Sequence, residues 1–135
     1  MSASQKHAWF NLTVVAATVV TVLALVPMLG PGAQGGFALL GLLGLGPIFF
    51  RRRAGVVVAD ERDLEIQRRS MLIAYVVFWL AFVIACVSLP AFYGWRGSVP
   101  VAVVQSSVWC AWILVVGVAS IATLSMDRLG EADAS

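Results

Sequence analysis

Charged residues are scarce in this chain, and long stretches contain none. Only 12% of its 135 residues are Asp, Glu, Lys or Arg, whereas 61% are hydrophobic. Soluble domains typically carry about 25% charged residues. So few charges cannot cover a water-facing surface, which excludes an ordinary soluble domain and leaves the lipid bilayer as the expected solvent.

Residues that commonly carry chemistry are also few. The chain has a single histidine, His7, and two cysteines, Cys86 and Cys110. One histidine excludes a bis-histidine haem within one chain, and the two cysteines fall at different depths of their helices, which disfavours a disulfide. The sequence has no Ser-His-Asp arrangement and no phosphate-binding glycine loop. We therefore expect no enzymatic activity, no metal and no cofactor, and the net charge of +2 gives no argument for a nucleic-acid partner.

Four apolar stretches are present instead. They cover residues 9–29, 35–50, 71–89 and 99–124. A membrane-spanning helix needs about 20 mostly apolar residues, and a backbone in lipid must satisfy its own hydrogen bonds, which favours helices. The first stretch is longer than the core of a signal peptide, so we expect it to be retained. The sequence predicts an all-α, polytopic membrane protein, a single domain over residues 1–135 that forms a compact bundle of four transmembrane helices.

The charge that these stretches lack is concentrated between the second and third of them. Residues 51–70, RRRAGVVVADERDLEIQRRS, hold six of the nine basic and four of the seven acidic residues. Loops rich in Lys and Arg remain in the cytoplasm, and with four spans both termini lie on the same side as this loop. The opposite side then carries only one basic residue, Arg96. We expect both termini in the cytoplasm, and contacts with lipid headgroups from Arg51, Arg52 and Arg53.

The middle of this charged segment has the features of a helix start. Asp60 can accept a hydrogen bond from a free backbone N–H, and Glu61 and Asp63 fall in the first turn, where the helix dipole favours acidic side chains. No Pro or Gly interrupts residues 60–89. The third membrane helix is therefore expected to begin at about Asp60 and to extend into the cytoplasm.

The charges of this helix start have a structural explanation and a functional alternative. Glu65 precedes Arg69 by four residues and Arg68 by three, spacings that form helical ion pairs. No His or Cys joins the acids, which disfavours a metal site or acid-base catalysis. The structural explanation is a capped, solvated helix. The alternative is a surface that docks a cytosolic protein, formed by Asp60, Glu61, Arg62, Asp63, Glu65, Arg68 and Arg69.

The order of these features resembles a known family. Two apolar helices precede the sequence DER, at Asp60, Glu61 and Arg62, and Ile66 and a third helix follow it. This order resembles an uncharacterised family of small prokaryotic four-helix membrane proteins with a DER signature before the third helix, a domain of unknown function. The resemblance implies a bacterial or archaeal origin, and so the inner membrane, but it implies no activity.

Inside the four apolar stretches, small residues recur at helical spacings while ionisable residues are absent. Pumps and channels usually keep ionisable groups in the membrane, so the absence disfavours them. Small residues let helices approach closely in lipid. The expected packing positions are Thr13, Ala17, Thr21 and Ala24 in the first stretch, Gly41, Gly44 and Gly46 in the second, Ala74, Ala81, Ala85 and Ser88 in the third, and Ser106, Cys110, Gly117 and Ser120 in the fourth.

Four other side chains are candidates for a ligand or subunit contact. Gln105 is expected to bond to another helix near the outer interface or to contact a ligand. Trp79, Trp109 and Trp112 fall outside the aromatic belts that mark membrane interfaces. A lipid, a quinone, a pigment or another subunit would each suit them, and packing in the bundle core or against lipid is the simpler explanation.

Abundant packing surface without catalytic groups favours a non-catalytic accessory or scaffold subunit of a larger membrane complex. Its partners would be the lipid bilayer and other membrane subunits or copies of itself. The alternative is a docking or signalling partner that binds a cytosolic protein through residues 60–69. The third hypothesis, a small oligomeric transporter, lacks the membrane-embedded carboxylate on which small multidrug pumps depend.

Overall fold

The computed structural model describes residues 3–45 and 61–132, and every regular element in them is a helix. In chain order these are α1 (Ala3–Leu29), η1 (Gly30–Leu45), α3 (Glu61–Tyr93) and α4 (Val101–Ala132). Three helical segments are long and apolar enough to cross a membrane, within α1, α3 and α4, and Gly32–Leu45 is a shorter apolar helix. The all-α class is confirmed, and three of the four expected spans have the length for crossing. The expected headgroup residues Arg51, Arg52 and Arg53 and the helix cap Asp60 lie outside the described residues.

The ends of α3 and α4 follow from local sequence. α3 begins at Glu61, one residue from the expected start, and contains Pro90 in its last turn. It stops at Gly94, which has a φ of 73° and donates its N–H to the Pro90 carbonyl at 2.8 Å. Glycine adopts this left-handed backbone without the steric cost that other residues meet. The Pro100 carbonyl then accepts the Val103 N–H at 2.9 Å and starts α4. A short connection therefore joins two long helices.

η1 is a 3₁₀ helix, whereas an α-helix was expected for the second span, and it starts at Gly30, five residues before the expected boundary. In a 3₁₀ helix, side chains three residues apart lie directly above one another and form a row along the helix. A row of bulky side chains is therefore crowded. One row of η1 is small throughout and exposed: Gly32, Gly35, Ala38, Gly41 and Gly44. The next row is buried or half-buried: Gln34, Phe37, Leu40 and Leu43. The three-residue period of small residues explains how this sequence tolerates the 3₁₀ geometry.

The hydrophobic core lies where η1, α1 and α4 meet. Its buried centre is formed by Val15, Phe37 and Leu40. Partly buried residues from the same three helices pack around it: Val22, Leu43, Trp109, Ile113 and Val116. η1 approaches α1 closely at Gly36, where an added Cβ would lie 2.9 Å from a methyl group of Val22.

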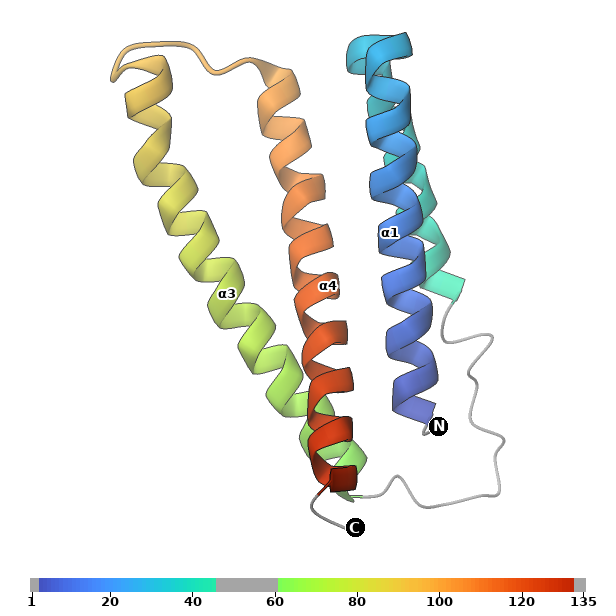
Figure 1. The fold of residues 1–135 in the computed structure, drawn as a ribbon. Helices are drawn as coiled ribbons and strands as arrows, with labels where there is room; N and C mark the ends of the chain where they lie inside the picture. Colours follow the sequence, from blue (N-terminus) through green and yellow to red (C-terminus); the bar gives the residue numbers. More distant parts are fainter. Residues whose placement is uncertain (1–2, 46–60, 133–135) are drawn as a thin grey trace.

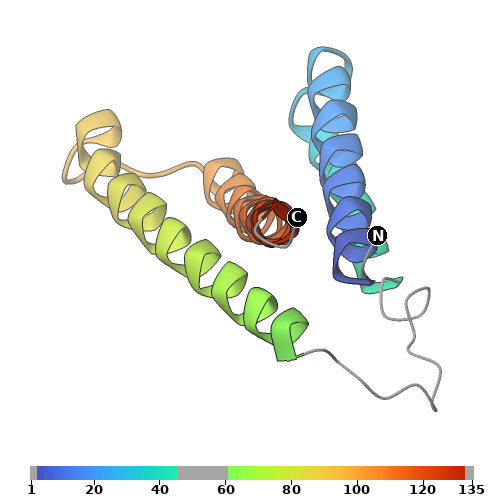
Figure 2. The same ribbon diagram turned by 60° about the horizontal axis from the view of Figure 1, so that its bottom comes forward.

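The helices form an open arrangement, so the expected compact bundle is wrong. η1 runs back alongside α1, α4 packs on α1, and α3 packs on α4 (Figure 1). α3 diverges from α4 towards the α3–α4 connection, and in the second view α4 lies between α3 and the pair formed by α1 and η1 (Figure 2). The expected small-residue positions explain the opening, because Ala74 and Ser120 are buried whereas Ala17, Ala24 and Ala85 are exposed. Among the described residues, only part of the expected packing surface of α1, α3 and α4 is used. Gly41 and Gly44 of η1 are exposed, and the expected packing position Gly46 lies outside the described residues.

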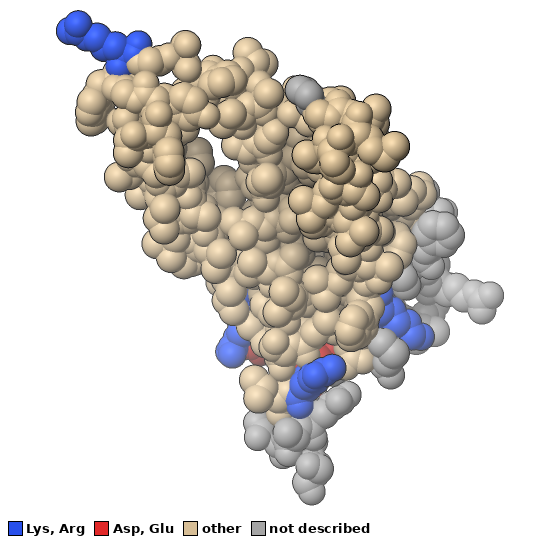
Figure 3. All heavy atoms as spheres, turned by 45° about the horizontal axis from the view of Figure 1, so that its top comes forward, with Lys and Arg blue, Asp and Glu red and all other residues tan. Residues whose placement is uncertain are grey.

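The basic side chains of the described residues gather at one end of the helices. Lys6 lies near the start of α1, Arg68 and Arg69 near the start of α3, and Arg128 near the end of α4. The α3–α4 connection at the other end of these helices contains a single basic residue, Arg96. Figure 3 shows Lys and Arg side chains at the two ends of the molecule, with a wide uncharged surface between them. We call the first of these ends the basic end. The charge separation along the helix axes is the pattern of a membrane-spanning protein.

Candidate functional site

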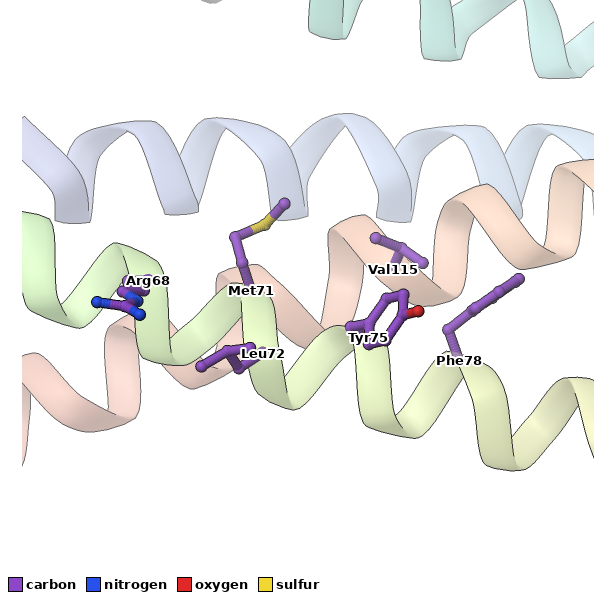
Figure 4. Close-up of a pocket in the computed structure, with 6 residues that line it drawn as sticks. All are labelled: Arg68, Met71, Leu72, Tyr75, Phe78 and Val115. Atoms are coloured by element: carbon purple, nitrogen blue, oxygen red, sulfur yellow. The ribbon is translucent and has the colours of Figure 1, made fainter.

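An apolar groove lies on α3 near the basic end, and Arg68 lies at one end of it. The groove has a volume of about 350 Å³. Five of its lining residues lie on one face of α3 and the sixth on α4: Arg68, Met71, Leu72, Tyr75, Phe78 and Val115. Figure 4 shows Arg68 at one end, Met71 and Leu72 next to it, and the rings of Tyr75 and Phe78 near Val115 at the other. Successive turns of one helix therefore build an apolar groove that has an arginine at one end.

One of the ion pairs expected at the start of α3 is present, between Glu65 and Arg69. The Arg69 guanidinium donates to a Glu65 carboxylate oxygen at 2.5 Å, and both side chains are exposed. Arg68 makes no ion pair in the part of the chain that the structure describes. Glu61, Arg62 and Asp63 are helical as predicted, but their side chains, like Asp60, lie outside the described part. The docking surface as a whole stays a prediction.

A polar contact between α3 and α4, which the sequence did not single out, holds the basic end of the groove together. The hydroxyl groups of Thr123 and Ser70 lie 3.0 Å apart, and the Ser70 hydroxyl donates to the Gln67 carbonyl at 2.9 Å. Ser70 and Ala74 are 1% and 0% exposed. Small residues allow α3 and α4 to approach closely here, and the contact between the two hydroxyl groups links the helices at a defined position. The signal available in the sequence was the four-residue spacing of Ser70 and Ala74.

A buried carboxylate near the end of α4 was also missed. Asp127 is only 7% exposed, and the Ser4 hydroxyl in the first turn of α1 donates to its Oδ2 atom at 3.5 Å. The helical segment of α4 with membrane-spanning composition extends to Leu129 and so includes Asp127. An acid near a helix C-terminus opposes the helix dipole, whereas next to a helix N-terminus it is favoured. Asp127 lies next to the N-terminus of α1, whose own first turn contains no acid, so its carboxylate supplies a negative charge where the dipole of α1 favours one.

The three candidate tryptophans are not brought together. Trp109 is half-buried and stacks on Phe37 of η1, with ring centroids 5.5 Å apart and planes at 9°, so it is a packing residue. Trp79 makes its ring contacts, within the described residues, with aromatic neighbours on its own helix: Tyr75, Phe78 and Phe82. Trp112 is 55% exposed. These positions form no common site, and a contact of Trp79 or Trp112 with lipid or another subunit stays a prediction.

The interhelical bond expected for Gln105 is made by a different glutamine. Gln34 of η1 donates to the Ser106 hydroxyl at 3.0 Å and lies 3.4 Å from the Ala102 carbonyl oxygen of α4. Gln105 itself is exposed. The sequence pattern did not single out Gln34, which lies one residue before the expected second span. A ligand contact of Gln105 stays a prediction.

The described residues offer no cluster for a metal. No group of three or more His, Cys, Asp or Glu side chains lies together among residues 3–45 and 61–132. Cys86 and Cys110 are exposed free thiols. The described residues present an apolar groove with an arginine at one end, and helix faces with many exposed hydrophobic side chains.

Comparison with known proteins places the chain in a family. The model of the family described as "Predicted membrane protein (DUF2178)" matches residues 4–124, which include α1, η1, α3 and most of α4. No curated protein and no solved structure matches the chain. The match agrees with the resemblance seen in the DER sequence and in the order of the helices, and this chain belongs to the DUF2178 family of membrane proteins of unknown function.

Proposed function

We propose that this protein is a non-catalytic accessory or scaffold subunit of a larger membrane complex, which it joins through lateral helix contacts. The observation that carries the proposal is the packing of α3, which among the described residues lies mainly against α4 and diverges from it along its length. Ala85 on α3 and Ala17 and Ala24 on α1 are small residues on exposed faces. In lipid, helix association depends on close packing of small residues, so these faces suit further helices.

We further propose that the protein lies in the inner membrane of a prokaryote, with the basic end and both termini in the cytoplasm. This topology requires four crossings. α1 and α3 both start at the basic end, since Ser4 contacts Asp127 and Ser70 contacts Thr123 of the same helix α4. The chain between the end of α1 and the start of α3 must therefore return across the membrane. A 3₁₀ helix rises about 2.0 Å per residue, so the 16 residues of η1 extend about 32 Å, comparable with a hydrocarbon core of about 30 Å.

The subunit proposal is tested by isolating the protein under conditions that preserve complexes. The tagged full-length chain is extracted in a mild detergent, its particle size is measured, and co-purifying proteins are identified by mass spectrometry. We expect a particle larger than the monomer with a stoichiometric membrane partner or further copies of the chain. Replacing Ala85 by Phe should remove the partner, whereas the same change at the exposed neighbour Ile84 should keep it. A monomer that carries no other protein would overturn the proposal.

A second candidate is a docking partner for a cytosolic protein, and the first turns of α3 favour it. α3 has 33 residues, or about 50 Å at 1.5 Å per residue, which exceeds the hydrocarbon core by several turns. Leu64, at 53% exposure, lies in this extension beside the Glu65–Arg69 pair. Reversal of Glu61, Asp63 and Glu65 to Lys should abolish capture of a cytosolic protein while membrane insertion persists. Capture by the triple variant would exclude this surface.

A further inference from the structure

We infer that the groove on α3 binds one anionic phospholipid of the leaflet at the basic end, with the phosphate at Arg68 and an acyl chain along the helix. This site is distinct from the open faces on which the subunit proposal rests, and it is independent of any partner protein. The shape of the groove, its length and the arginine at its end each match such a lipid.

The lining residues match the two parts of a phospholipid. Met71, Leu72, Tyr75 and Phe78 offer methylene, thioether and ring surface, which suits a hydrocarbon chain but no polar ligand. Val115 of α4 forms the other wall, so the groove lies at the α3–α4 contact rather than on a bare helix (Figure 4). An unbranched chain can follow such a groove because its rotatable bonds adapt to the contour of the side chains.

The length of the groove matches one leaflet. Arg68 and Phe78 are ten residues apart on α3, which corresponds to about 15 Å along the helix axis. Half of a hydrocarbon core of about 30 Å is the same length. A phospholipid whose phosphate lies beside Arg68 would therefore place its acyl chain along the whole groove and end near the middle of the bilayer.

The positive charge of Arg68, at one end of the groove, favours an anionic lipid over a neutral one. Glu65 pairs with Arg69, which leaves Arg68 as a cation without an ion pair among the described residues. The residues four before and four after Arg68 are Leu64 and Leu72, and the acid three residues before it, Glu65, is the one that pairs with Arg69. A guanidinium group binds phosphate oxygens through two parallel hydrogen bonds, and the long arginine side chain reaches the headgroup level while its methylene groups stay in apolar surroundings.

The test compares retained lipids in matched variants. The full-length protein is reconstituted into vesicles with equal amounts of dioleoyl phosphatidylglycerol and dioleoyl phosphatidylcholine, extracted in a mild detergent and weighed by native mass spectrometry. We expect one bound phosphatidylglycerol on the unaltered protein. Arg68→Gln should reduce the ratio of bound phosphatidylglycerol to phosphatidylcholine by about fivefold, the effect of one basic residue near an anionic membrane surface. Arg128→Gln, an exposed arginine at the same end outside the groove, should leave the ratio unchanged.

A second pair of variants tests the chain end of the site. Val115→Phe fills the inner wall and should remove the bound lipid of either type, whereas Val108→Phe, at an exposed position of α4 outside the groove, should retain it. Excess glycerol phosphate should not displace the lipid, because the headgroup alone lacks the apolar contacts. Equal lipid ratios in the unaltered protein and Arg68→Gln, equal retention in the two Phe variants, or displacement by glycerol phosphate would each overturn the inference. Circular dichroism of each variant confirms that a loss of lipid is not a loss of helix.

Discussion

At the scale of single residues, adjacent glycines of η1 have opposite environments. A Cβ on Gly36 would lie 2.9 Å from a Val22 methyl group, whereas a Cβ on Gly35 would meet nothing within 4 Å. Valine is stiff about χ1, so Val22 cannot turn aside without moving the α1 backbone. The glycine at position 36 is therefore required by the packing of η1 on α1, and the one at position 35 is not.

The first prediction compares alanine at these two positions. Gly36→Ala should lower the free energy of unfolding by about 1–3 kcal/mol, the usual cost of overpacking a tight contact. Gly35→Ala should be neutral or stabilise by up to about 1 kcal/mol, because alanine loses less backbone entropy than glycine. Thermal unfolding in one detergent, followed by circular dichroism, measures both. Equal stabilities for the two variants would contradict the observed approach of η1 to α1.

The second prediction concerns the buried carboxylate of Asp127. Replacement by Ala removes both the Ser4 contact and an anion next to the start of α1, and should destabilise the protein by about 1–2 kcal/mol, the range for a partly buried charge at a helix terminus. Arg128→Ala, at the exposed neighbouring position, serves as the control and should change stability little. The melting temperatures of the two variants decide the matter. A larger loss in Arg128→Ala than in Asp127→Ala would refute this role.

At the scale of helices, the α3–α4 contact is confined to the half of α3 near the basic end. Ala74 is fully buried there, while Ala85, three turns further along the same helix, is exposed. Ala74→Leu should therefore force the helices apart at the Ser70–Thr123 contact and cost about 1–3 kcal/mol. Ala85→Leu, the same change in the same helix, should have little effect on the isolated protein. Both are measured by unfolding in increasing denaturing detergent. If Ala85→Leu is the more disruptive, the two helices do not diverge as observed.

The sequence predicted α1, α3 and α4 more accurately than η1, for a physical reason. Long apolar runs with few Gly or Pro residues favour an α-helix in lipid, and α3 begins within one residue of the predicted start. In Gly30–Leu45, small residues every third position make the 3₁₀ form accessible, and hydrophobic content alone does not separate it from an α-helix. A 3₁₀ helix has three residues per turn, whereas an α-helix has 3.6, so the two forms turn different side chains towards a neighbouring helix. In η1, Gln34 and Phe37 are the side chains that contact α4.

At the scale of the whole molecule, the candidate site was only partly accessible to sequence reasoning. The Glu65–Arg69 pair follows from local spacing and is confirmed. The groove depends on Val115, forty-seven residues from Arg68 in the sequence, and on the angle at which α3 leaves α4. The same angle makes the bundle open rather than compact. Small-residue spacing indicates that a helix face can pack closely, but it does not say whether its partner belongs to the same chain.

The last prediction tests the topology on which the location of the groove depends. With Cys86 and Cys110 replaced by Ala, single cysteines are introduced at three exposed positions: Lys6 near the start of α1, Leu64 near the start of α3, and Ser98 in the α3–α4 connection. Ser98 is preferred to Gly97, because a Cβ on Gly97 would lie 1.7 Å from the Tyr93 carbonyl oxygen. Intact bacterial cells expressing each variant are treated with a membrane-impermeant maleimide, and the labelling is repeated after lysis.

Cysteine at Ser98 should be labelled in intact cells, and cysteines at Lys6 and Leu64 only after lysis, because the proposed topology places the basic end of the helices in the cytoplasm. The reverse pattern would mean that the orientation is inverted, which would place the Arg68 groove in the outer leaflet and exclude a cytosolic partner for α3. Labelling of Lys6 and Leu64 from opposite sides would mean that the chain does not cross the membrane between α1 and α3. Because α1 and α3 start at the same end of the structure, that result would contradict both the role of η1 as a span and the contacts of Ser4 and Ser70 with α4.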